Sequence, residues 1–141
     1  MERIVGKLGK LPACPQAAFK FSSYFNSEAL PVPPKHFGHY GLVKSFGMLG
    51  NDTAGDCVFA GAAHETMMWA LEGSHTAAFD AAAVLSDYSA VTGYNPADPL
   101  SDRGTDIVAA ADYRRKTGIV DASGKRHKVD AYIALKLQDW D

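Results

Sequence analysis

The chain has 141 residues, which fits a single domain that buries roughly two thirds of its unfolded surface. Apolar residues make up 47% and charged residues 21%, as in soluble globular proteins. A formal net charge of -2 gives no general attraction to nucleic acid or to anionic membranes. The N-terminus lacks the apolar core of a secretion signal, and no apolar run approaches the ~18 residues that span a bilayer. We therefore expect no membrane segment and a cytoplasmic location.

Residues 1–50 are rich in proline and glycine and hold five of the seven prolines. Proline excludes regular helix, so we expect an extended arm that packs across a helical subdomain at 51–141. His36 and His39 in this arm stand three residues apart. A metal site usually needs three or four ligands, and no second ligand pair follows. We therefore expect neither a metal nor a cofactor.

The rest of the chain is organised around residues 48–71, where a polar turn runs into an apolar helix. Cys57 stands where the helix begins, with Asp56 or Thr53 as its cap and Gly73 as its end. The first two turns have no polar face, so this should be the most buried helix. We expect Phe59, Ala63 and Trp69 to contact the other helices; the full apolar set is Val58, Phe59, Ala60, Ala62, Ala63, Met67, Met68, Trp69 and Leu71.

A cysteine at a helix start is a candidate nucleophile. The first backbone N–H groups are unpaired there and the helix dipole is positive, and both favour the thiolate. The chain has only one other cysteine, Cys14. The two could form one disulfide, but nothing indicates a secreted disulfide framework.

Asn51 lies six residues before Cys57. The stretch resembles the papain-like cysteine peptidases, which place an oxyanion-hole glutamine six residues before the nucleophile. Asn51 replaces that longer amide, and Val58 stands where the family usually has tryptophan. The resemblance implies that Cys57 is the nucleophile and that Asn51 and the Cys57 N–H form the oxyanion hole.

A closer resemblance is to poorly characterised bacterial and bacteriophage proteins that have an N-D-x-x-G-D-C turn and a later Y-x-x-V-x-G-Y-N-P segment. The segment is YSAVTGYNP here, residues 88–96. This resemblance implies ancestry rather than a substrate, and it adds packaging in a phage particle as an alternative location.

Downstream, we expect helices at 76–92 and 105–117, begun by Ser74 or Thr76 and by Thr105, and ended by Gly93 and Gly118. The prolines of 94–104 predict a turn-rich loop with solvated acids, because the spacing of an EF-hand is missing. Residues 125–128, KRHK, read as a solvated rim rather than a nucleic-acid site. Residues 129–137 alternate partly and predict a strand.

These elements predict a mainly helical α+β fold with a proline-rich extended arm and little strand, and the resemblance implies that it is the helical N-terminal half of a papain-like domain. The catalytic histidine is unassigned. His64 sits seven residues after Cys57 on the same helix, ~10 Å along its axis, and we expect it to lie between the helix and the core. His75 flanks the second helix, and His127 is the only downstream candidate.

Two functions of different class follow. The first is a cysteine hydrolase or peptidase domain that acts on peptide, amide or isopeptide bonds. The second is a non-catalytic papain-like structural or binding module, such as a bacteriophage virion component, in which Cys57 is a small buried residue. Both imply a protein or peptide partner or a homo-oligomer, and neither implies nucleic acid or membrane.

Overall fold

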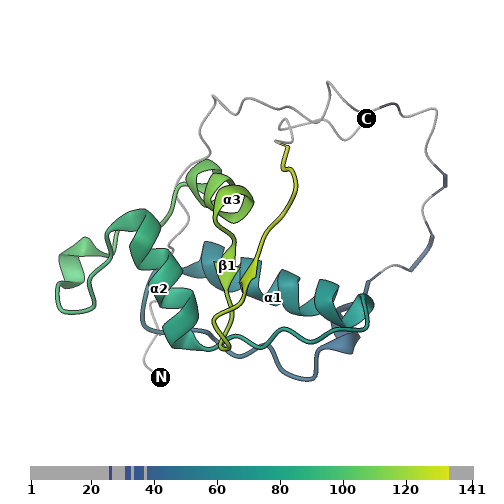
Figure 1. Ribbon diagram of the computed structural model, residues 1–141, viewed down its shortest axis with the longest axis horizontal. Coiled ribbons are helices and arrows are strands. Elements are labelled where there is room, and N and C mark those ends of the chain that lie inside the picture. Colours follow the sequence, from purple (N-terminus) through teal and green to yellow (C-terminus); the bar gives the residue numbers. More distant parts are fainter. Residues whose placement is uncertain (1–25, 27–30, 33, 37, 134–141) are drawn as a thin grey trace, which may run out of the picture.

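The computed structural model describes residues 26, 31–32, 34–36 and 38–133. Three helices surround a short antiparallel hairpin (Figure 1). The fold is therefore α+β and mainly helical, as the sequence predicts. In chain order the elements are η3 (Tyr40–Leu42), α1 (Cys57–Glu72), α2 (Ala81–Thr92), η4 (Pro99–Ser101), α3 (Ile107–Lys116), β1 (Ile119–Val120) and β2 (Arg126–His127).

Helix α1 is the long central helix, and α2, α3 and β1 all contact it. It begins at Cys57 and ends before Gly73, as predicted. Asp56 occupies the N-cap position, but its side chain makes no capping hydrogen bond. The hydroxyl of Thr53 donates instead to the Gly50 carbonyl at 3.1 Å. Neither predicted cap therefore acts through its side chain, and the first N–H groups of α1 are left without one.

The predicted starts of the next two helices are too early, by five residues for α2 (81 rather than 76) and by two for α3 (107 rather than 105). Helix α2 begins at Ala81 because the carboxylate of Asp80 accepts a hydrogen bond from Ala83 N at 2.8 Å. Helix α3 begins at Ile107 because Asp106 accepts from Ala109 N at 2.8 Å. An aspartate cap fixes each boundary in place of the serine or threonine expected from the sequence.

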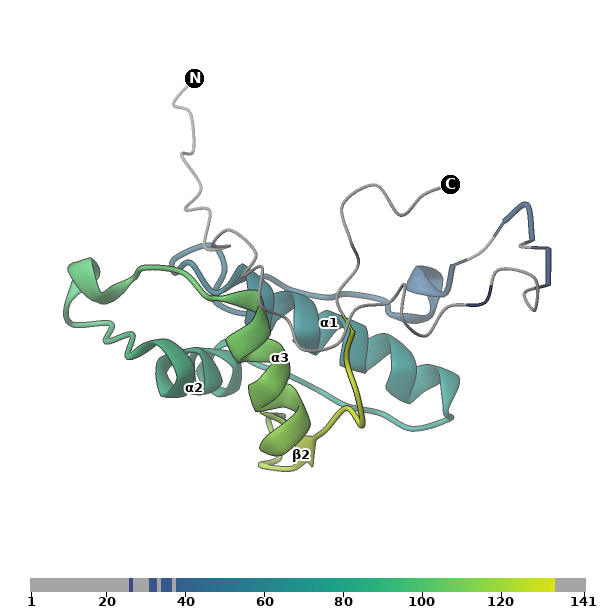
Figure 2. The same cartoon turned by 90° about the horizontal axis from the view of Figure 1, so that it is seen from above.

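The helix ends agree better with the sequence. Gly93 closes α2 in the left-handed conformation at φ 73°. Helix α3 ends with a basic turn that suits the helix dipole, and Gly118 follows it. Residues 94–104, between α2 and α3, form the expected loop, which contains η4 and projects from the body of the molecule (Figures 1 and 2).

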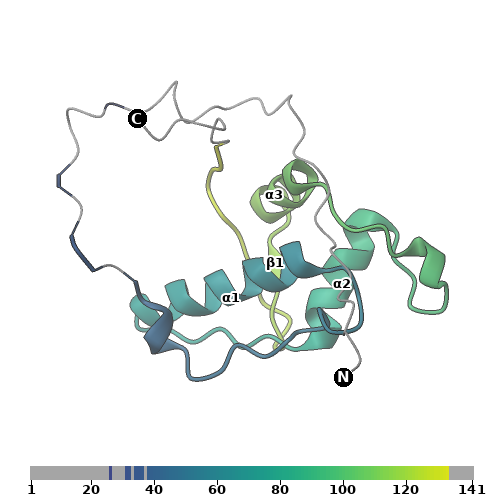
Figure 3. The ribbon, with the colours of Figure 1, turned by 180° about the vertical axis from the view of Figure 1, so that it is seen from behind.

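The strand prediction is wrong for residues 129–133, which are irregular, while 134–137 lie outside the described residues. The strands are instead β1 and β2, paired in the register Ile119 with His127 and Val120 with Arg126. The hairpin crosses one side of α1, which lies in front of it when the molecule is viewed from behind (Figure 3). Two-residue strands are too short to show an alternating pattern in the sequence.

The core lies where the three helices meet. Phe59 is 1% exposed and Ala63 is fully buried, as predicted. The Phe59 ring packs against Tyr88 of α2 and Tyr113 of α3, with centroids 6.3 and 6.1 Å away. Trp69 differs, since 47% of it is exposed and its contact with α3 is the Arg114 guanidinium, 5.8 Å from the ring centroid.

Most of the predicted arm lies outside the described residues, so its path and the boundary at 50/51 stay predictions. The described part of the arm runs alongside α1. Contacts join η3 to α1, and His39 forms an ion pair with Glu72 at the C-terminal end of the helix. Farther along, the Gly47 carbonyl lies 3.1 Å from His64 Nε2, and the ring of Phe46 packs on the imidazole. The segment thus leads back toward the start of α1.

Gly50, in the turn before α1, has no room for a side chain. Its φ is +102°, and an added Cβ would lie 2.9 Å from Leu85 Cγ. We expect Gly50→Ala to lower the free energy of unfolding by ~1–3 kcal/mol, because it combines backbone strain with a clash. Gly61→Ala is the control, since Gly61 lies in α1 with nothing within 4 Å. Urea unfolding should show the control unchanged or up to ~1 kcal/mol more stable; equal stability of the two variants would contradict this.

Candidate functional site

The turn before α1 is compact and mostly buried. Backbone bonds run from Asn51 N to Met48 O and from Ala54 N to Gly50 O, at 3.0 and 2.9 Å. Ala54 and Asp56 are buried, whereas Cys57 is half-buried and its thiol is free. Cys14, the other half of the disulfide considered from the sequence, lies outside the described residues. The turn thus places the partly accessible thiol of Cys57 at the first position of the buried helix α1.

Asp102 ties this turn to the distant loop after α2. Its carboxylate accepts hydrogen bonds from Gly55 N at 3.1 and 3.0 Å and from the Tyr88 hydroxyl at 2.6 Å. The hydroxyl of Tyr88 in turn accepts from Gly104 N at 3.2 Å. Burial, together with the bond to Asp102, raises the pKa of Tyr88 above its usual range. The two motifs of the bacteriophage resemblance thus meet through Asp102.

The sequence reading of Asp102 as a solvated acid is wrong, because this side chain is half-buried and hydrogen bonded. No spacing in the sequence joins residues 55 and 102. The only sequence signal was at Tyr88, the first residue of the second motif. The hydrogen bonds of Asp102 to Gly55 and Tyr88 could be seen only in the folded structure.

The Tyr88 hydroxyl can be tested alone. We expect Tyr88→Phe to lower the free energy of unfolding by ~1–3 kcal/mol, because both Asp102 and Gly104 N lose a buried partner. Tyr94→Phe is the matched control, since no hydrogen bond of the Tyr94 hydroxyl occurs among the described residues. Thermal unfolding of both variants measures the difference. The Asp102 link would be refuted if the two substitutions had the same effect.

Asp56, directly before the thiol, is an unusual carboxyl group. It is 0% exposed, and neither of its oxygens has a hydrogen-bond partner among the described residues. Burial raises its pKa from 3.8 to about 7, and the nearby charges of Asp102 and Asp52 add to the increase. Asp56 is therefore largely neutral below pH 7, and a neutral carboxyl does not repel a thiolate on the next residue.

Asn51, the predicted oxyanion-hole residue, lies in the same turn and is half-buried. Its Oδ1 is buried without a hydrogen-bond partner among the described residues. The hydrogen-bond donor of the Asn51 side chain is its amide nitrogen, which is the atom an oxyanion would need. In the described structure no hydrogen bond joins the Asn51 side chain to Cys57, so its role at an oxyanion stays a prediction.

All five histidines of the chain lie within the described residues, and none is hydrogen bonded to Cys57. His39 pairs with Glu72, and His64 contacts the Gly47 carbonyl. His36 is exposed and His75 follows α1. The fifth, His127, was the sequence candidate for the catalytic base, and it has a different partner.

His127 pairs with Asp121 rather than with the thiol. Its Nε2 lies 2.8 Å from Asp121 Oδ2, and the two side chains are only 16% and 6% exposed. Burial alone would raise the pKa of Asp121, but bonds from His127, Ser123 and Lys125 N outweigh it and hold that pKa well below its usual range. Asp121 is therefore a fixed carboxylate that orients the imidazole.

His127 also lines a cavity on the side of α1. The residues of α1 in that lining are Thr66, Trp69 and Ala70, in its C-terminal half. Thr66 is nine residues beyond Cys57, which is ~13 Å along the helix axis. The imidazole and the thiol thus belong to different parts of the helix.

Searches against protein-family models, curated proteins and solved structures gave no match. The described residues contain no group of three or more histidine, cysteine, aspartate or glutamate side chains arranged to hold a metal ion. Within the same part of the chain, no helix has the length and apolarity needed to cross a membrane.

Proposed function

We propose that this chain carries the cysteine half of a papain-like hydrolase site, which acts on a peptide, amide or isopeptide bond. Cys57 is the nucleophile in this proposal. The observation that carries it is the position of the thiol, which is free, half-buried and first in a helix whose next turns are buried. Such a position supplies unpaired N–H groups and an approach path together.

In the proposed hydrolysis, each group has one role. The Cys57 sulfur attacks the carbonyl carbon, and the Cys57 N–H and the Asn51 amide donate to the oxyanion. The leaving amine departs when an acid protonates it, and water then hydrolyses the thioester. The acid is ordinarily an imidazole. Since none of the five histidines in residues 1–141 is hydrogen bonded to Cys57, the imidazole would come from outside these residues, from a further segment, a second polypeptide or another copy.

The test measures hydrolysis of a panel of peptide, amide and isopeptide substrates by the full chain. The assay is run with the chain alone and with added cell fractions that contain a partner able to supply the imidazole. Cys57→Ala should abolish turnover, and Asn51→Ala should lower it by about 10²-fold or more, as for the loss of an oxyanion donor. Cys14→Ala is the matched control and should keep full activity. Turnover that survives Cys57→Ala would refute the proposal.

The second candidate is a non-catalytic papain-like structural or binding module, such as a bacteriophage virion component. It is favoured by the histidines, because His127 and His64 are held by other groups than the thiol. On this alternative the protein is packaged from the cytoplasm into a particle, and its partner is a protein surface. Recovery of the chain in purified particles, with wild-type infectivity after Cys57→Ala, would favour it.

A further inference from the structure

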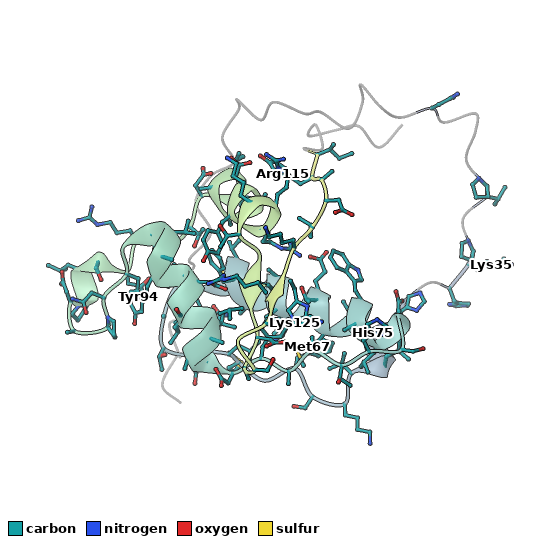
Figure 4. All side chains as sticks on the ribbon, in the orientation of Figure 1. Lys35, Met67, His75, Tyr94, Arg115 and Lys125 are labelled. Atoms are coloured by element: carbon teal, nitrogen blue, oxygen red, sulfur yellow. The ribbon has the colours of Figure 1, made fainter. Side chains whose placement is uncertain are left out.

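A cavity of about 380 Å³ lies against the C-terminal half of α1, away from the start of the helix. Three segments line it: α1, the loop that follows α1, and β2 with its neighbours. Figure 4 labels His75 of the loop and Lys125 of the hairpin, both drawn close to α1. The complete lining is Thr66, Trp69, Ala70, His75, Thr76, Lys125, Arg126, His127, Lys128 and Val129.

The lining is cationic. Lys125, Arg126 and Lys128 supply its charged groups, and none of the described residues that line it carries a carboxylate. The guanidinium of Arg126 is committed elsewhere, since it donates to Asp87 at 3.0 Å and to the Gly118 carbonyl at 2.7 Å. Lys125 and Lys128 form no ion pair in the part of the chain that the structure describes, and the lining offers no carboxylate to neutralise them.

Two carboxylates on the elements that line the cavity or adjoin it are already paired. Glu65 on α1 accepts from Arg114 at 2.7 Å, and Asp121 is saturated by His127, Ser123 and Lys125 N. Because Asp121 holds Nε2, the other ring nitrogen of His127 is the one left to bind a ligand. An imidazolium between Asp121 and a bound anion would donate to both.

Trp69 adds an apolar wall to the cationic one. It is 47% exposed, although a large aromatic side chain usually buries more. The hydroxyl of Thr66 beside it is occupied by the Ala62 carbonyl at 2.8 Å. Ala70 adds to the apolar part of the lining that α1 supplies.

We propose that this cavity binds a small molecule in which a phosphate or carboxylate group is attached to a flat apolar ring. Lys125, Lys128 and His127 receive the anionic group, and the ring lies on Trp69. The size of the cavity falls within the range of small-molecule sites. This site does not depend on the Cys57 proposal.

Phenyl phosphate, benzoate and inorganic phosphate are the probes, added to the full chain at physiological ionic strength. We expect saturable shifts in the imidazole NMR signals of His75 and His127, with His36 unaffected. A response to phenyl phosphate alone assigns a phosphate ligand, and a response to benzoate alone assigns a carboxylate. No saturable shift with any probe at millimolar concentration would overturn the proposal.

Three variants locate the binding. Lys125→Ala/Lys128→Ala should weaken phenyl phosphate binding at least about tenfold, because two charge-assisted contacts are lost. Lys35→Ala/Lys44→Ala removes the same charge from exposed lysines outside the cavity and should change binding by less than about twofold. Trp69→Ala should weaken the aromatic probes and leave inorganic phosphate unchanged. An equal loss in the two double variants would show non-specific attraction and overturn the proposal.

Cys57→Ala separates this site from the proposed hydrolase. We expect it to retain full phenyl phosphate binding, since Cys57 does not line the cavity. Loss of binding in a folded Cys57→Ala protein would contradict the separation of the two sites.

Discussion

Asp56→Asn is expected to remove a pH dependence of stability that the wild-type protein shows between pH 4 and 7. Since the pKa of Asp56 rises from 3.8 to about 7 on folding, the folded state binds the proton more tightly in this range. The stabilisation is complete below pH 3.8 and is lost as pH rises toward 7. At about 1.4 kcal/mol per pKa unit, the loss amounts to a few kcal/mol.

The measurement is urea unfolding of wild type and Asp56→Asn across this pH range. The free-energy difference between them should shift in favour of the asparagine variant as pH rises. Asp130→Asn changes an exposed carboxylate and serves as the control. Asp121 acts in the opposite direction, because its lowered pKa makes it stabilising above its unfolded pKa and costs stability only in more acid solution. A constant difference from pH 4 to 7 would mean that Asp56 is ionised when folded.

Asp87→Ala is expected to destabilise the protein by about 3–5 kcal/mol, because it removes a buried carboxylate that accepts three hydrogen bonds, one of them from a guanidinium. Asp87 is 1% exposed and accepts from Tyr113 Oη at 2.7 Å, Val120 N at 2.7 Å and Arg126 at 3.0 Å. One carboxylate of α2 thus joins α3 and both strands.

Denaturant unfolding measures this loss, and Asp130→Ala, an exposed carboxylate, should stay within about 0.5 kcal/mol of wild type. The expected loss is a large share of the ~5–15 kcal/mol that holds a domain folded. The cavity site should weaken as well, because β2 carries part of its lining. A loss below about 1 kcal/mol would show that Asp87 does not hold the hairpin.

The central helix could be predicted from the sequence because local signals define it. The apolar run after Cys57 and the glycine at 73 fix its two ends, and the absence of a polar face predicts the burial of Phe59 and Ala63. The starts of α2 and α3 were missed because several residues could cap each helix. Only tertiary structure decides which of them does.

The surroundings of the thiol could not be predicted, because they depend on contacts between distant residues. Asp102 reaches Gly55 across 47 positions, and Asp87 reaches Arg126 across 39. Both aspartates look like ordinary polar residues in the sequence. Pairing of His127 with Asp121 depends likewise on a hairpin too short to leave a periodic pattern.

The most direct test of Cys57 as a nucleophile is its alkylation by iodoacetamide, read by peptide mass at each cysteine over a range of pH. An activated thiol at a helix start should react faster in the folded protein than in the urea-unfolded chain at the same pH. We expect that result for Cys57, with the neutral Asp56 beside it posing no repulsion below pH 7. If Cys57 instead stays unlabelled until denaturant is added, the thiol is a packed core residue and catalysis by it is excluded.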